Sequence, residues 1–180
     1  ADPSLAPSLV NLEWLVVGGL SALLGGSPLL AYRLFGLLAL LALVFGIERW
    51  LTRSGLPPER RLAGLLLVCT GGGLGGLLFA LGHVPGERAL DVRTGAFPFV
   101  EAIANPHFVA GTALLLAALG AFAAGRGATG AALGTVLGLV RPYDAALLAG
   151  IESLAVLLTA PAREWPRRLL PVAALWLVLR

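Results

Sequence analysis

Several ionisable side chains of this sequence lie within or beside long apolar runs, and these are the residues that could do chemistry. An ionisable group in hydrocarbon is costly, so it usually faces a protein partner or a water-filled cavity. The residues that could line one such cavity are Arg33, Glu101, His107, Arg141, Tyr143, Asp144 and Glu152. Two interpretations stay open: buried ion pairs, such as Arg141 with Asp144, that only fix helix packing, and a polar cavity open to one side of a membrane.

The spacing of these residues favours a common location. Glu152 follows Asp144 by two helical turns, so both side chains are expected on roughly the same helix face, with Glu152 near the middle of the bilayer. Pro142 breaks the chain just before this helix, close to one membrane surface. The residues expected near that surface are Arg33, Glu101, His107, Arg141, Tyr143 and Asp144.

Metal and nucleophile chemistry receive less support from the sequence. His83 and His107 bracket a segment that contains Glu87, Asp91 and Glu101, but their spacings match no metal-ligand signature. We therefore assign no metal ligands and no particular cofactor, with a divalent metal as the weaker alternative. Cys69 is the single cysteine, so no disulfide framework is expected. No Ser-His-Asp or Cys-His spacing indicates a nucleophile, and we assign no catalytic residue.

The composition predicts an integral membrane protein. Hydrophobic residues make up 58% of the chain and charged residues 13%, and the mean hydropathy is +0.89. These values exclude an ordinary soluble domain, because several runs approach the roughly 20 apolar residues that cross a bilayer. The net charge of +3 does not indicate nucleic-acid binding. The basic residues are arginines in short clusters between apolar runs, a pattern typical of membrane topology.

The apolar runs predict a single all-α transmembrane domain over residues 1–180, with about five full spans. The expected elements are a juxtamembrane surface helix over 9–26, spans over 29–51, 62–82, 107–124, 129–140 and 143–160, an outer loop over 83–106 and a partial span over 169–180. Ser27-Pro28 and Asn105-Pro106 each supply an N-cap followed by a first-turn proline. The short last run and the lack of methionine indicate an excerpt of a longer protein.

The arginines predict the orientation of the spans. Alternate crossings bring one group of arginines to the same side: Arg49, Arg53, Arg60, Arg61, Arg126, Arg163, Arg167 and Arg168. The positive-inside rule places these arginine-rich loops in the cytoplasm and the loop 83–106 outside.

Two passages resemble the polytopic bacterial glycosyltransferases of the C-type fold, which take sugars from polyprenyl-phosphate donors. NLEWLVVGGLSALLGGSPLLAYRLFGLLALLALVFGIERWL resembles their passage from a juxtamembrane helix into the second span, with Arg33 at the position of a family arginine. NPHF, which opens a helix, and VRPYD, which follows an apolar run, resemble the middle of large family members. Arg141 replaces the usual histidine of that second motif.

The resemblance implies sugar transfer from a polyprenyl-phosphate donor at the outer face of the bacterial cytoplasmic membrane. Arg33 and Arg141 would offset phosphate charge, and Glu101, His107 and Asp144 would line the acceptor side. In the family the catalytic acidic residue lies in an outer loop upstream of the juxtamembrane helix. This chain begins at or after that loop, so whether it is itself an enzyme stays open.

The alternative is a non-catalytic transmembrane scaffold subunit of a larger membrane complex. Glycine-rich spans suit the close helix contacts of such an assembly. The partners would then be membrane lipids and other membrane subunits. Neither interpretation involves nucleic acid.

Overall fold

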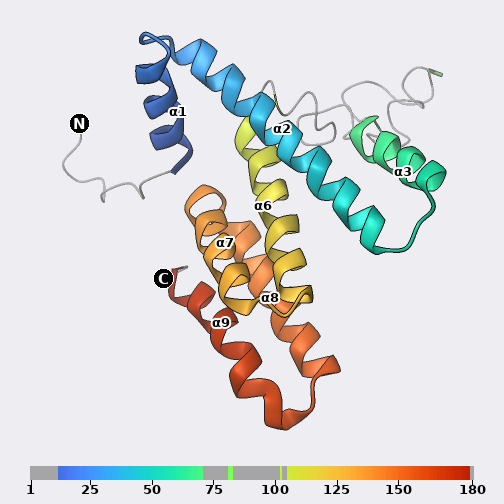
Figure 1. Cartoon of the computed structure of the whole chain (residues 1–180). Coiled ribbons are helices and arrows are strands. Elements are labelled where there is room, and N and C mark those ends of the chain that lie inside the picture. The colour runs from blue at the N-terminus through green and yellow to red at the C-terminus, as the bar shows by residue number, and fades with distance from the viewer. Residues whose placement is uncertain (1–11, 71–80, 83–101, 103–104, 179–180) are drawn as a thin grey trace.

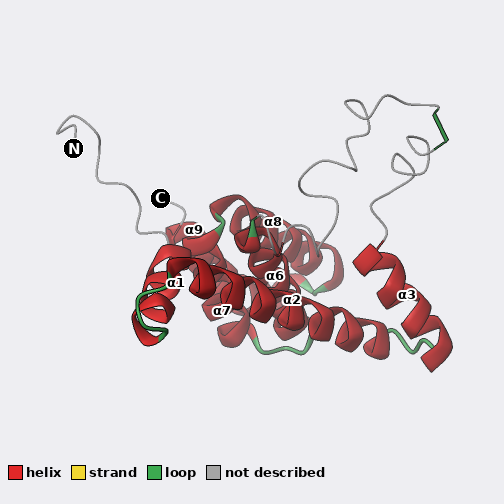
Figure 2. Ribbon diagram, turned by 90° about the horizontal axis from the view of Figure 1, so that it is seen from above, coloured by secondary structure: helices red, strands yellow, loops and turns green. Residues whose placement is uncertain are grey.

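The computed structural model of the chain describes residues 12–70, 81–82, 102 and 105–178, and its regular elements there are all helices, as the sequence predicts (Figures 1 and 2). They are α1 (Leu12–Leu23), α2 (Pro28–Arg53), α3 (Pro58–Thr70), α6 (Pro106–Ala123), α7 (Gly127–Val140), α8 (Pro142–Thr159), the 3-10 turn η2 (Ala162–Glu164) and α9 (Trp165–Val178).

Three helices, α2, α6 and α8, are long and apolar enough to cross a membrane. They have 26, 18 and 18 residues, which correspond to about 39, 27 and 27 Å, beside a hydrocarbon core of about 30 Å. These helices lie at the expected spans 29–51, 107–124 and 143–160. Their length and composition are those of an integral membrane protein.

Of the other expected spans, two correspond to short helices and one lies partly outside the described residues. The run 129–140 lies in α7, which has 14 residues and is therefore only about 21 Å long. α9 also has 14 residues. The run 62–82 lies partly in α3, whereas residues 71–80 are outside the described part, as is most of the loop 83–106. A total of about five full spans therefore stays a prediction.

The expected helix starts are found, with one difference in their capping. The Ser27 side chain accepts a hydrogen bond from Leu30 N at 3.4 Å, as an N-cap serine should. Asn105 occupies the N-cap position of α6, but its side chain makes no capping hydrogen bond. Pro106 and Pro142 each stand in the first turn of their helices, α6 and α8, where the missing N–H costs no helix hydrogen bond.

α2 and α6 pack side by side and run in the same direction (Figure 1). Just before the start of α6, the chain approaches α2 so closely that a Cβ at Gly36 would overlap the carbonyl oxygen of Ala102. Near their last turns, Trp50 Nε1 donates to Leu116 O at 3.1 Å and Arg53 Nη1 to Gly120 O at 3.5 Å. The Arg53 charge thus lies at the negative end of α6, where a cation is favoured.

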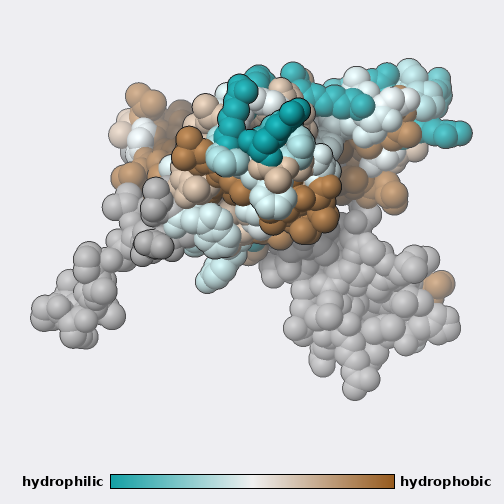
Figure 3. Space-filling model, turned by 90° about the horizontal axis from the view of Figure 1, so that it is seen from below, coloured by the Kyte–Doolittle hydropathy of each residue, from teal (hydrophilic) through white to brown (hydrophobic). Residues whose placement is uncertain are grey.

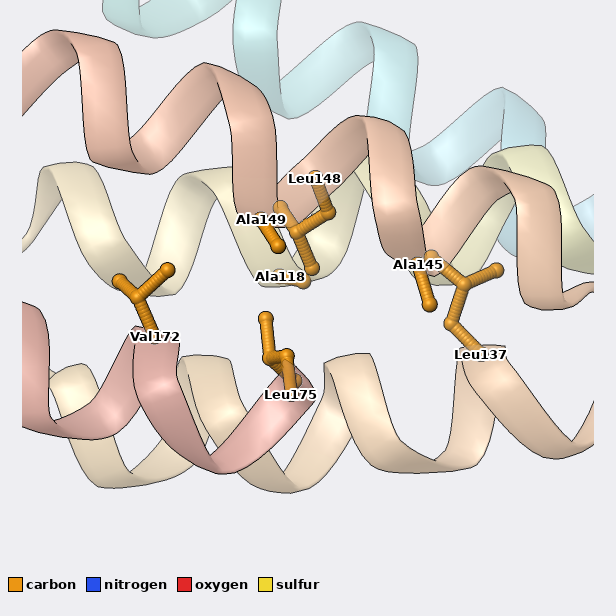
Figure 4. Packing of buried hydrophobic residues seen from close by; sticks show 7 residues of the cluster. All are labelled: Ala118, Leu137, Ala145, Leu148, Ala149, Val172 and Leu175. Carbon is orange, nitrogen blue, oxygen red and sulfur yellow. The ribbon is translucent and has the colours of Figure 1, made fainter. Parts of the chain in front are cut away.

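The last four α-helices, α6 to α9, form a bundle with one apolar core, in which helices consecutive in the chain run in opposite directions (Figures 1 and 4). Its buried residues are Ala118, Leu137, Ala145, Leu148, Ala149, Val172 and Leu175. Gly134 lets α7 approach its neighbours, because a Cβ there would lie 2.5 Å from Leu175 Cδ2 and 2.9 Å from Leu148 Cδ2. Small residues that allow close contact are typical of helix packing in membranes. α3 packs against α2, away from this group (Figures 1 and 2).

The bundle has two chemically different ends. The starts of α1, α6 and α8 meet at one, which we call the His107 end. The ends of α6 and α8 and the starts of α7 and α9 meet at the other, the basic end. Arginines gather there: Arg53, Arg126, Arg163, Arg167 and Arg168. Figure 3, seen from below, shows hydrophilic side chains concentrated on the face that the lower end of Figure 1 presents.

Candidate functional site

An open pocket of about 520 Å³ lies at the His107 end and brings together several of the residues that the sequence analysis selected. We call it the His107 pocket. Its lining residues come from five helices and the N-cap positions of two of them: Glu13 and Trp14 of α1, Tyr32 of α2, Asn105, His107 and Phe108 around the start of α6, Val140 at the end of α7, and Arg141, Pro142 and Tyr143 around the start of α8.

The starts of α6 and α8 both face this pocket. Asn105 and Arg141 are the two N-cap residues, and both side chains leave the capping position unused. Instead, both residues line the pocket. Because a helix N-terminus carries a partial positive charge, two of them around one pocket favour an anionic group there.

Arg141 is held in place by Asp144 and Phe108. Its Nη1 lies 2.8 Å from Asp144 Oδ2, and its Cζ lies 4.3 Å from the centre of the Phe108 ring. Gly111 makes room for this pair, because a Cβ there would lie 2.5 Å from Arg141 Cδ and 3.2 Å from Asp144 Oδ2. An ion pair and a polar pocket, the two interpretations left open by the sequence, therefore occur at the same place.

Glu13 is a site residue that the sequence analysis missed. Its side chain is 4% exposed, and its Oε2 lies 3.5 Å from His107 Nδ1. Burial raises the pKa of Glu13, and the nearby His107 opposes this in part. An acidic residue in the first turn of an apolar helix was the available signal, since a carboxylate in such a place usually has a partner. The partner could not be identified, because it lies in a distant segment.

An aromatic rim of Trp14, Tyr32 and Tyr143 adds to the pocket; the sequence analysis selected Tyr143 but missed Trp14 and Tyr32. The rings of Trp14 and Tyr32 stack with their centroids 6.4 Å apart. Trp14 is 62% exposed and Tyr143 is 83% exposed. Tryptophan and tyrosine concentrate where a membrane meets water, because their rings are apolar and their N–H and O–H groups are polar.

The remaining selected residues lie elsewhere. Arg33 is exposed on α2, next to Tyr32 in sequence but outside the pocket lining. Glu152 lines a separate crevice at the basic end, although Asp144 of the same helix is at the His107 end. The separation of eight residues corresponds to about 12 Å along α8. Glu101 lies outside the described residues.

The described residues contain no group of three or more His, Cys, Asp or Glu side chains that could hold a metal ion. His83, Glu87, Asp91 and Glu101, which the sequence analysis considered for this role, lie outside the described part.

No protein-family model, no curated protein and no solved structure matches the chain. Three helices that are long and apolar enough to cross a membrane make the chain compatible with the class of integral membrane proteins, and an amphipathic pocket lies at one end of these helices.

Proposed function

We propose that the His107 pocket binds the phosphate-bearing head of a lipid-linked substrate, and that the activity it serves is sugar transfer from a polyprenyl-phosphate donor. The second part follows the resemblance of the sequence to the C-type glycosyltransferases. One observation carries the first part. Two helix N-termini and the guanidinium of Arg141 surround a single pocket at the ends of α6 and α8.

The charges of the pocket suit a phosphate that shares Arg141 with Asp144. The ion pair uses Nη1 of Arg141, and a guanidinium has five N–H donors in all. The remaining donors and the helix dipoles are available to a phosphate. Arg141 is thus placed to contact the phosphate of the donor. Arg33, the other arginine that the sequence analysis proposed for this role, is exposed on α2 and does not line the pocket.

The rim suits the sugar and its acceptor. The exposed rings of Trp14 and Tyr143 offer flat apolar faces against which the C–H face of a sugar ring can pack. His107, held by Glu13, is a group that can accept a proton from an acceptor hydroxyl. A pocket that combines aromatic and apolar side chains with a few polar groups is typical of small-ligand sites.

The orientation that the arginines predict is consistent with the same proposal. Arginines concentrate in cytoplasmic loops of membrane proteins, so the basic end would face the cytoplasm of a bacterial cell. The His107 pocket would then open to the outer face, where the donors of the resembled family are used.

Two substitutions of the same ion pair test this proposal. Arg141→Gln should lower the affinity for a short-chain polyprenyl phosphate at least about tenfold, because hydrogen bonds to charged groups contribute roughly 1.5–3 kcal/mol. Asp144→Asn should raise it, because Arg141 is then fully available. Binding is measured by titration of the purified protein in detergent.

The two substitutions are expected to change the affinity in opposite directions, and this distinguishes an effect on ligand recognition from an effect on folding. If the ion pair only stabilises the helices, both substitutions should weaken binding together and lower the thermal midpoint. Arg163→Gln, which removes an arginine at the basic end, is the matched control for net charge. Unchanged affinity in Arg141→Gln would rule out a phosphate site in the His107 pocket.

The scaffold alternative has one observation in its favour. Only 28%, 33% and 22% of the best spanning windows of α2, α6 and α8 are buried within the chain. The remaining surface is covered by lipid or by other membrane subunits. Absence of polyprenyl-phosphate binding in the test above, together with retention of the protein in a larger complex after mild solubilisation, would favour this alternative.

A further inference from the structure

We propose that a second site, at the basic end, binds the headgroup of an anionic phospholipid. The site is an open crevice of about 920 Å³ between the α6–α7 turn and the corner formed by α8, η2 and α9. We call it the Arg167 crevice. It is independent of the proposed function, because it lies at the opposite end of α8 from the His107 pocket.

The rim of the crevice carries a positive charge that the described part of the chain does not neutralise. Arg168 contacts Glu164 Oε2 through Nε at 2.9 Å and through Nη2 at 2.7 Å. Arg167 stands beside it in the first turn of α9 and makes no ion pair with any described residue. Arg168 is therefore offset by Glu164, whereas the charge of Arg167 is available to a phosphate.

The wall of the crevice is apolar and comes from α6, α8 and α9, of which α6 and α8 are long and apolar enough to cross a membrane. Phe122 closes it on the α6 side, Val156 on the α8 side and Pro171 on the α9 side. Trp165 lies at the same corner, and its Nε1 donates to Ala160 O at 3.0 Å. Such a tryptophan is typical of the membrane–water interface. A basic rim above an apolar wall at this level fits a phospholipid, which has a charged head and apolar chains.

Glu152 sets the depth that an anionic group can reach. It lines the crevice seven residues before Thr159, the last residue of α8, and so about 10 Å deeper. A carboxyl group offers no cationic partner to a phosphate that moves inward, whereas Arg167 attracts one at the rim. The geometry thus places the phosphate at the rim.

Lipid binding to the purified full chain in detergent tests this site. Native mass spectrometry counts dioleoylphosphatidylglycerol and dioleoylphosphatidylcholine molecules bound at increasing lipid concentration. The first phosphatidylglycerol should bind more tightly than the first phosphatidylcholine. Arg167→Gln should weaken that phosphatidylglycerol about fivefold, the contribution of one arginine near an anionic surface. Arg167→Lys should retain most of the affinity, because the charge is kept.

Two further variants make the outcome specific. Arg163→Gln removes one charge from the same end but not from the crevice lining, and it should leave the first binding step unchanged. Glu152→Gln should not weaken it. Equal losses in Arg163→Gln and Arg167→Gln would overturn the proposal in favour of general surface charge. Displacement of the lipid by millimolar glycerol phosphate would overturn it in favour of a soluble phosphate ligand.

Discussion

At the scale of single residues, the contact between Glu13 and His107 links α1 to the start of α6. The carboxylate is almost fully buried, and its Oε2 lies 3.5 Å from His107 Nδ1. Burial disfavours the charged form of a carboxyl, and a nearby imidazolium favours it. Since burial is the larger cause here, the pKa of Glu13 lies above its ordinary value of 4.5.

This raised pKa predicts how stability depends on pH. Between pH 4.5 and the raised value, the folded protein binds more protons than the unfolded chain, so the free energy of unfolding falls as pH rises through this window. Glu13→Gln should remove that slope. Thermal midpoints of the detergent-solubilised protein between about pH 4 and pH 7 measure it. The exposed Glu59→Gln is the control, and an identical slope in Glu13→Gln would contradict the assignment.

At the scale of elements, glycine positions decide how closely the helices pack. Gly134 of α7 faces Leu148 of α8 and Leu175 of α9 with no room for a Cβ, whereas a Cβ at Gly150 of α8 would meet nothing within 4 Å. Gly134 is therefore required for packing, whereas Gly150 only lowers the helix propensity of α8.

Alanine substitutions at these two glycines should have opposite effects. Gly134→Ala should destabilise the protein by about 1–3 kcal/mol, because overpacking forces the neighbouring leucines to move. Gly150→Ala should stabilise it by about 0.5–1 kcal/mol, because alanine favours the helix. Unfolding in denaturant, followed by circular dichroism in mixed micelles, measures both. Similar destabilisation by the two substitutions would show that α7 is not packed as described.

Local features of the helices could be predicted from the sequence, whereas contacts between distant helices could not. α2, α6 and α8 were predictable because Ser27-Pro28, Asn105-Pro106 and Pro142 mark helix starts directly before long apolar runs. The place of Glu152 was not predictable. Periodicity assigns a residue to a face of its own helix, but it does not show which other helix covers that face. The meeting of Glu13 with His107 depends on such long-range packing as well.

At the scale of the whole molecule, the two ends differ in charge and in the ligand that each would take. The His107 pocket combines helix N-termini with ion pairs and aromatic rings. The Arg167 crevice combines arginines with an apolar wall. α8 runs between the two sites and is long enough to cross the membrane. If α8 spans the membrane, the two ends present different chemistry to the two compartments.

Labelling of single cysteines from each side of the membrane tests this arrangement. In a Cys69→Ser background, Tyr143→Cys and Arg163→Cys place thiols at the first turn of α8 and just beyond its last turn. If α8 spans the bilayer with the basic end inside, an impermeant maleimide added to intact cells should label Tyr143→Cys. It should label Arg163→Cys only after the membrane is opened, because positive loops stay in the cytoplasm. Labelling of both positions in intact cells would mean that α8 does not cross the membrane, and labelling of Arg163→Cys alone would mean that the chain is inserted with the opposite orientation.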